Sequence, residues 1–128
     1  MFEKLEIVRM AQALAAHSGT RQSVVARNIA NADTPGYHAQ DLPEFRAVYR
    51  SDSPSSMKST RPGHLSPRET GAEMAPRIVN GAAAPNGNTV SLEGEMVKAA
   101  EIRQGHDMAL SVYRASSDIL RAALGRSR

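Results

Sequence analysis

The residues able to carry catalytic or metal chemistry are scattered along this chain. Its four histidines, His17, His38, His64 and His106, lie far apart, and none has a second ligand at the spacing of a helical metal site. No serine, histidine and aspartate share a context typical of a nucleophilic triad, and no glycine-rich phosphate loop precedes a helix. We therefore expect no catalytic, cofactor-binding or metal-binding residues, and a protein that is not an enzyme.

Charged groups in the last third of the chain are expected to have structural roles. We interpret Glu93, Glu95, Asp107 and Asp118 as solvated charges or as charges that match a helix dipole. His106 is expected to be packed or to face another subunit, where its protonation would make assembly sensitive to mild acid.

Two asparagines mark the end of the first helical stretch. Asn28 and Asn31 lie one helical turn apart, so both side chains can share a face. Their amides can bond backbone carbonyls or a partner helix. The pair alone is weak evidence for function, because asparagine is common near helix ends.

The tetrapeptide Thr34-Pro35-Gly36-Tyr37 follows and predicts a tight turn. Pro35 disfavours the helical conformation at Thr34, and Gly36 supplies the positive φ that a type II turn requires at its third position. The first helix is therefore predicted to end near Asp33.

Composition narrows the classes of partner. The chain has 128 residues, 16 Lys and Arg against 13 Asp and Glu, no Cys and no Trp. The basic residues are dispersed and aromatic platforms are lacking, so we expect no nucleic-acid partner. No apolar run approaches the roughly 18 residues of a membrane span, so we expect no membrane insertion. Glu3, Glu6 and Arg9 interrupt the start of the chain, which does not favour a cleaved signal peptide.

The helical periodicity is concentrated in the two ends of the chain. A seam of three- and four-residue steps runs from Ile7 to Ala32, with a bend, fray or pause in packing plausible near Gly19. The last segment has heptad spacing, with Ser91 as a fair N-cap and Gly125 as the closing C′ glycine. We name its apolar line the C-terminal seam and predict that it lies at a subunit interface: Leu92, Met96, Ala99, Leu110, Tyr113, Leu120 and Leu124.

The middle of the chain has a different character. Tyr37, Phe45 and Tyr49 gather near Leu42, either in a loop that folds back on the first helix or in a docking surface for a neighbouring subunit. Beyond them, proline, glycine and serine are frequent and large apolar residues are few, which predicts a flexible spacer.

The expected fold is all-α, with two long amphipathic helices that pair as a coiled-coil-like hairpin joined by a loop-rich, partly disordered middle. Four segments follow: an N-terminal amphipathic helix over residues 1–33, a turn and aromatic loop over 34–50, a flexible spacer over 51–90, and a C-terminal heptad helix over 91–125. Because the C-terminal heptads include Arg103, His106 and Ser117, two such helices make a poor core alone, and partners are implied.

Two motifs together resemble the bacterial flagellar basal-body rod protein family. Residues 28–37 read Asn-Ile-Ala-Asn-Ala-Asp-Thr-Pro-Gly-Tyr, and residues 87–96 read Gly-Asn-Thr-Val-Ser-Leu-Glu-Gly-Glu-Met at the start of the C-terminal helix. The short spacer and the Asp41-Leu42 pair are similar to the proximal rod subunits of this family, of which two types stay open. The family signature maps onto Asn28, Asn31, Thr34, Pro35, Gly36 and Tyr37.

The resemblance implies a structural subunit that leaves the cytoplasm through the flagellar type III export apparatus without a cleaved signal peptide. It would then assemble helically in the periplasmic rod of the basal body, with copies of itself and with other rod and basal-body proteins, and transmit torque. The alternative from another class is a cytoplasmic helical adaptor or export chaperone. That alternative has no need of the Pro35-Gly36 turn, so substituting these two residues would separate the two hypotheses.

Overall fold

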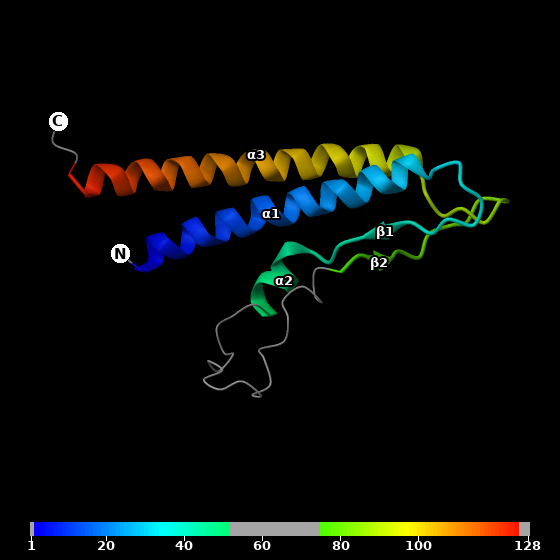
Figure 1. Cartoon of the computed structure of the whole chain (residues 1–128), viewed down its shortest axis with the longest axis horizontal. Helices are drawn as coiled ribbons and strands as arrows, with labels where there is room; N and C mark the ends of the chain where they lie inside the picture. The colour runs from blue at the N-terminus through cyan, green and yellow to red at the C-terminus, as the bar shows by residue number, and fades with distance from the viewer. Residues whose placement is uncertain (1, 52–74, 126–128) are drawn as a thin grey trace, which may run out of the picture.

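The fold, seen in a computed structural model that describes residues 2–51 and 75–125, is a hairpin of two long helices (Figure 1). The helix α1 (Phe2–Ala30) and the helix α3 (Leu92–Ala123) run side by side in opposite directions, so the start of α1 and the end of α3 lie at the same end of the hairpin. Between them come β1 (Gln40–Asp41), the short helix α2 (Phe45–Ser51) and β2 (Arg77–Ile78). The expected all-α class is confirmed, while residues 52–74 of the predicted spacer lie outside the described residues.

Helix α1 runs unbroken past Gly19, where the sequence suggested a bend or a fray. Its polar residues are accommodated within the helix, because the Thr20 hydroxyl donates to Ala16 O at 3.1 Å and the Ser23 hydroxyl donates to Thr20 O at 2.7 Å. The helix ends at Ala30, three residues before the predicted end at Asp33.

Helix α3 has the ends that its sequence predicts. Ser91 is in an extended conformation and its hydroxyl accepts a hydrogen bond from Gly94 N, which confirms the N-cap. At the other end Gly125 has a φ of 61°, which confirms the C′ glycine.

Each long helix buries a line of side chains spaced seven residues apart, and α1 also buries His17, Val24 and Asn28 beside its line. In α1 the line contains Ala11, Ser18 and Val25, and in α3 it contains Glu95, Ile102 and Ala109. Most of these side chains are small, so the helices can pack closely but bury little apolar surface. Outside this line, the C-terminal seam leaves Leu92, Met96 and Leu124 exposed by 44%, 57% and 78%.

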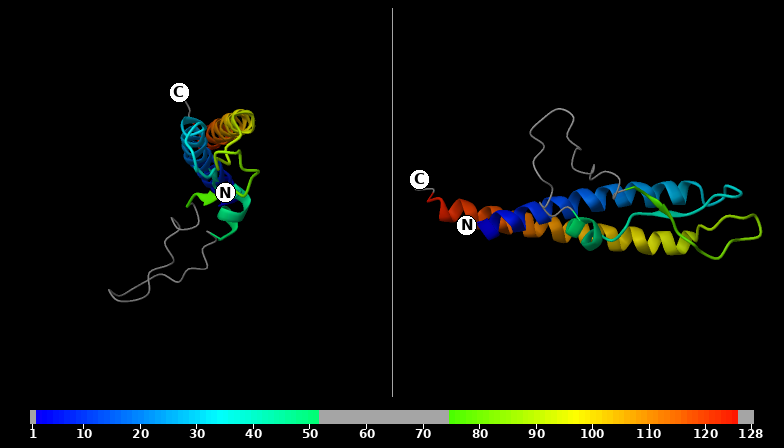
Figure 2. Two further views of the ribbon diagram at one scale, coloured as in Figure 1. Left: turned by 90° about the vertical axis from the view of Figure 1, so that its right-hand side faces the viewer. Right: turned by 90° about the horizontal axis from the view of Figure 1, so that it is seen from below.

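The elements β1, α2 and β2, which we call the return segment, cover one face of the helix pair. Strands β1 and β2 pair antiparallel, with Gln40 opposite Ile78 and Asp41 opposite Arg77. The end-on and lower views show this pair and α2 on the same side of α1 and α3, while no other described segment covers the opposite side (Figure 2).

The aromatic residues hold α2 against α1. His17 Nε2 donates to Pro43 O at 2.9 Å, and the rings of His17 and Phe45 meet edge to face at 5.7 Å. The Phe45 and Tyr49 rings lie 5.3 Å apart, whereas Tyr37 bonds the chain before α3, since its carbonyl accepts from Thr89 N at 3.0 Å. Residues 34–50 thus fold back on the first helix, and they contain β1 and most of α2 where a turn and loop were expected.

Within residues 2–51 and 75–125, neither long helix has an apolar stretch sufficient to cross a membrane.

Candidate functional site

The signature turn closes the tip of the hairpin. Tyr37 N donates to Thr34 O at 3.3 Å, and Gly36 has a φ of 71°, as the type II turn predicted. Gly36 N donates to Asn86 O at 3.0 Å, so the turn also contacts the chain that leads into α3.

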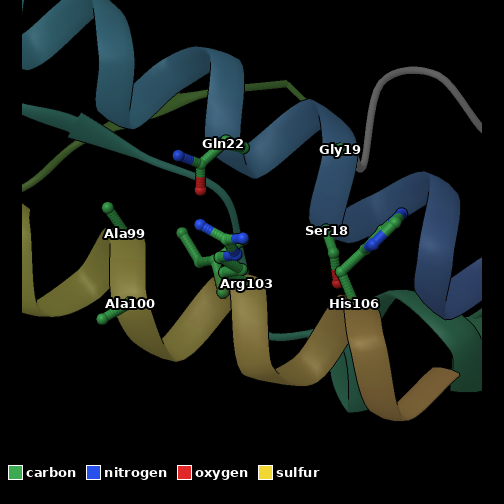
Figure 3. Close-up of a pocket in the computed structure, with 8 residues that line it drawn as sticks. Ser18, Gly19, Gln22, Ala99, Ala100, Arg103 and His106 are labelled. Carbon is green, nitrogen blue, oxygen red and sulfur yellow. The ribbon is translucent and has the colours of Figure 1, made fainter.

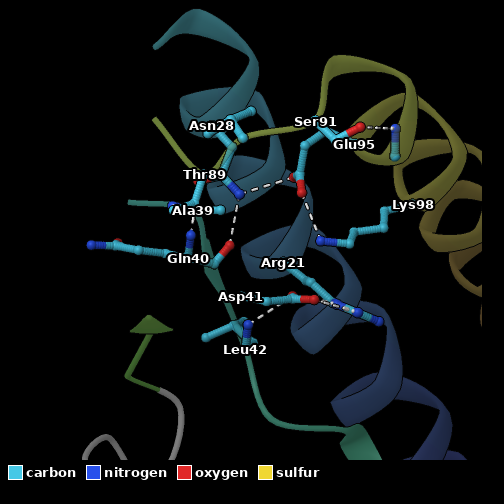
Figure 4. A network of polar contacts seen from close by, with 12 residues as sticks. Arg21, Asn28, Ala39, Gln40, Asp41, Leu42, Thr89, Ser91, Glu95 and Lys98 are labelled. Atoms are coloured by element: carbon cyan, nitrogen blue, oxygen red, sulfur yellow. Dashed lines mark hydrogen bonds and ion pairs between the residues drawn. The ribbon is translucent and has the colours of Figure 1, made fainter. Parts of the chain in front are cut away.

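Asn28 is the centre of the tip and is fully buried. Its Nδ2 donates to Gln40 O at 2.7 Å, and its Oδ1 accepts from Gln40 N at 3.1 Å. The amide thus pairs with the Gln40 backbone as a neighbouring strand would. Nδ2 also donates to Glu95 Oε2 at 2.9 Å (Figure 4). Oδ1 also accepts from the Tyr37 hydroxyl at 3.3 Å. All four hydrogen-bonding positions of the side chain are therefore used.

Glu95 corrects one expectation from the sequence. It was expected to be a solvated or dipole-matching charge, but its side chain is only 3% exposed. Oε2 accepts from Asn28 and Oε1 accepts from Lys98 Nζ at 2.6 Å, which compensates for the burial of the charge. The expectation failed because seven-residue spacing places Glu95 on the line of Ile102 and Ala109, which faces α1.

Asn88 is the second buried amide of the tip and is 2% exposed. Its Nδ2 lies 2.9, 2.7 and 2.9 Å from the carbonyl oxygens of Asn31, Ala32 and Thr34, which follow the last helical residue of α1. Its Oδ1 accepts from Val90 N at 2.7 Å. Asn88 thus ties the turn that follows α1 to the chain that leads into α3, and the carbonyls of Asn31 and Thr34 also accept from backbone nitrogens of the turn.

We call Asn28, Tyr37, Gln40, Asn88 and Glu95 the tip clasp. The clasp joins the two sequence motifs, since Asn28 and Tyr37 belong to the first and Asn88 and Glu95 to the second. In the described part of the chain every buried side-chain nitrogen or oxygen has a hydrogen-bond partner.

Asn31 has a different role from Asn28, although the two lie one turn apart. Its side-chain amide donates to Arg27 O at 2.8 Å within its own helix, and its Oδ1 accepts from the Thr34 hydroxyl at 3.2 Å. Of the predicted signature residues, Asn28 and Tyr37 enter the clasp by their side chains, whereas Asn31 and Thr34 contact Asn88 by their carbonyls. Pro35 and Gly36 form the exposed turn.

An ion pair beside the clasp fixes β1 to α1. Arg21 Nε and a terminal nitrogen each donate to Asp41 at 2.7 Å, and Leu42 N donates to Asp41 Oδ1 at 2.8 Å. Burial raises the pKa of Asp41, but the hydrogen bonds and charge of Arg21 outweigh it, so the pKa lies below its usual value. The same pairing raises the pKa of Arg21.

The remaining sequence candidates lie apart from the tip. His17 binds the return segment, His38 is exposed, and His64 lies outside the described residues. In the C-terminal seam, Tyr113 is exposed while Ala99, Leu110 and Leu120 are half-buried. Across residues 2–51 and 75–125, no three potential metal ligands form a group.

A shallow groove runs between α1 and α3, with a volume of about 560 Å³. Figure 3 shows Gln22 and Ser18 of α1 and Arg103 and His106 of α3 pointing into the space between the helices. The return segment lies behind the helices in this view, so the groove opens on the uncovered face. Its other lining residues are Gly19, Ala99, Ala100 and Ile102.

These features define the chain as one that packs against other chains. The buried polar groups hold backbone and helix ends in place, and the exposed apolar residues lie along helices. Such an arrangement is suited to packing against other chains.

Comparison with known proteins identifies the family. The model of the flagella basal body rod protein family matches residues 11–38, which include Asn28 and the signature turn. The chain is 35% identical over 117 residues to the flagellar basal body rod protein FlgB of Agrobacterium fabrum, covering 88% of this chain and 87% of that protein. It is 32% identical to the FlgB of Escherichia coli strain K12, covering 87% of this chain and 88% of that protein. This chain therefore belongs to the flagellar basal body rod protein family.

Proposed function

We propose that this chain is a structural subunit of the proximal flagellar rod and that it assembles helically with copies of itself and with other rod proteins. The similarity to two FlgB proteins, spanning nearly nine-tenths of the chain, carries this proposal. Of the two proximal types left open by the sequence, both relatives favour the FlgB type.

The physical role of such a subunit is to transmit torque. Long helices lying near the axis of a tube share side-chain contacts with several neighbours and so resist twisting. The exposed Leu92, Met96 and Leu124 of the C-terminal seam supply apolar surface for such contacts. The subunit catalyses no reaction and requires no cofactor under this proposal.

Reaching the rod requires passage through the flagellar type III export apparatus into the periplasm, without a cleaved signal peptide. A chain of low stability suits this route, because it must unfold to pass a narrow channel. The small side chains between α1 and α3 support a loosely formed pair of helices in the isolated monomer. A cooperative, sharply melting monomer would count against this part of the proposal.

The experiment replaces the chromosomal copy in the bacterium that encodes this chain and follows the protein into purified basal bodies. The wild-type chain is expected in the rod fraction. Pro35→Ala combined with Gly36→Ala is expected to reduce rod incorporation and swimming, because Gly36 needs a positive φ. Gly19→Ala is the control, because Gly19 is helical and has open space around it.

The adaptor or chaperone alternative predicts a different result. An adaptor would stay in the cytoplasm, be absent from basal bodies and be indifferent to the turn substitutions. The relatives do not favour this alternative, since both are named as rod proteins.

A further inference from the structure

The uncovered face of the hairpin has a groove between α1 and α3, and the cationic side chain of Arg103 lines it. Ser18, Gly19, Ala99 and Ala100 leave room between the helices, and a Cβ added at Gly19 would meet nothing within 4 Å. Arg103 points into this space (Figure 3). Among the described residues no carboxylate lies within ion-pair distance of Arg103, so any anionic partner must come from elsewhere.

A second exposed surface of α3 is apolar apart from one acidic side chain, which complements the charge of Arg103. It is a row at intervals of four and seven residues, which we call the outer row: Val97, Glu101, Met108, Val112 and Ile119. Val97, Met108 and Ile119 are exposed by 59%, 57% and 53%.

The outer row places its one charge among apolar side chains. Glu101 is exposed, and it forms no ion pair within the described part of the chain. Arg21 is influenced by the charge of Glu101, but its guanidinium is already bound to Asp41 through two nitrogens. The carboxylate of Glu101 is therefore available to a neighbouring molecule.

The groove and the outer row lie on different faces of the same helix. Glu101 and Arg103 are two residues apart, so their side chains point about 200° apart around the helix axis. A single molecule cannot bring the two surfaces together, whereas two molecules can.

We propose that the groove of one copy of this chain receives the outer row of a second copy, with Arg103 facing Glu101. The apolar residues of the row fill the space above the small groove residues, and the charge pair fixes the register, as one polar position does in an apolar helix seam. The proposal rests on the assignment as a self-assembling rod subunit and identifies the surfaces that meet. Because the two surfaces differ, the contact repeats from copy to copy instead of closing a symmetric dimer.

The test uses the absence of cysteine from this chain, which removes any background of disulfides. The variant E101C/R103C replaces the wild-type copy, and basal bodies are isolated and mildly oxidised. The two cysteines cannot bond within one molecule, because they point to different faces of α3. Disulfide-linked dimers and longer ladders are expected, with the link mapped by mass spectrometry to residues 101 and 103.

Three control variants separate the possible contacts. The variants R103C and E101C, each alone, are expected to give at least about tenfold fewer linked dimers, since neither surface meets its own kind. The variant R9C/R103C pairs the groove with an exposed position on α1, and it is likewise expected to give at least about tenfold fewer linked dimers. Dimers from R103C alone would show groove meeting groove, dimers from E101C alone would show row meeting row, and either result overturns the proposal.

The charge pair has its own test. R103E and E101R are each expected to lower incorporation into basal bodies by about tenfold, and the double variant E101R/R103E is expected to recover most of it. A double variant no better than either single one would overturn the proposal. Failure of the proposed function is distinguishable, because the wild-type chain would then be absent from basal bodies. If the wild-type chain is present but E101C/R103C gives no linked dimers, only this inference fails.

Discussion

The two ends of the hairpin differ in the side chains that they bury and expose. The tip, where α1 ends and α3 begins, buries the polar side chains of Asn28, Asn88 and Glu95, all with partners inside the chain. The opposite end, where α1 begins and α3 ends, is called the open end. It leaves exposed, by between 41% and 78%, the side chains of Ile7, Met10, Met108, Ile119 and Leu124. The buried polar groups of the tip are therefore satisfied within one molecule, although Leu92 and Met96 are exposed there, whereas the open end presents apolar surface suited to neighbours.

This difference also separates two kinds of specificity. Buried hydrogen bonds at the tip require defined partners and so define one geometry, because a misplaced donor or acceptor would be left buried and unpaired. The apolar contacts of the open end are less directional. Substitutions at the tip should therefore affect the isolated chain, and those at the open end should affect the assembly.

The largest expected effect follows from Asn28→Ala. The substitution leaves the Gln40 backbone and Glu95 Oε2 without their Asn28 partner, and we expect the tip to lose about 3 kcal/mol of local stability. In hydrogen exchange, the Gln40 amide should lose about a hundredfold in protection. Asn31→Ala is the matched control, since its side chain bonds only within residues 27–34, and its effect should stay below about 1 kcal/mol. Equal effects of the two substitutions would contradict the role given to Asn28.

Asn88→Ala should have the next largest effect, about 2 kcal/mol at the tip. It removes the side-chain donor that ties the carbonyls of Asn31, Ala32 and Thr34 to the chain before α3, so the turn after α1 should loosen. Backbone chemical shifts of residues 29–37 measure this directly. Asn80→Ala provides the control at an exposed position of the same segment, and a similar spectral change there would refute the prediction.

The Arg21–Asp41 pair should contribute about 1 kcal/mol, because both side chains are only partly buried. The pKa of Asp41 is lowered by folding, so this contribution is complete above the ordinary value of 3.8 and is lost as the pH falls through the lower folded pKa. A carboxyl NMR titration measures the pKa. In Arg21→Met it should rise, because burial then acts without the compensating cation, and an unchanged pKa would exclude Arg21 as the cause.

The smallest effect on the isolated chain is expected at the open end. Ile119 is 53% exposed, so Ile119→Gln should change local stability by less than about 0.5 kcal/mol. Its effect should appear in the assembly, as a lower amount of the chain in purified basal bodies. A large loss of helix in the isolated variant, measured by circular dichroism, would mean that Ile119 already packs within one molecule.

Local features could be predicted from the sequence wherever a nearby cause acts. Pro35 and Gly36 determine the turn through their own backbone preferences, and Ser91 and Gly125 mark the ends of α3 in the same way. The burial of individual residues was harder to predict. Heptad spacing identified α3 as amphipathic, but the line that faces α1 contains Glu95, Ile102 and Ala109, whereas Leu92 and Met96 are exposed.

The clasp and the return segment could not be predicted for a physical reason. The hydrogen bonds from Asn28 to Glu95 and from Asn88 to Asn31 span 67 and 57 residues, and no local preference signals which distant atom will meet an amide. Strands β1 and β2 contain two residues each, which is too short for a period to appear in the sequence.

The sequence by itself determined two long helices, the turn between the first helix and the return segment, and the family of the chain. These depend on backbone preferences, helical period and local motifs, all of which act over a few residues. Only the tertiary structure decided that Glu95 is buried, that Asn28 replaces a strand partner for Gln40, and that the described residues cover one face of the hairpin and leave the other open. Those outcomes depend on which distant groups come together when the two helices pack, since burial and hydrogen-bond partners are properties of the whole fold.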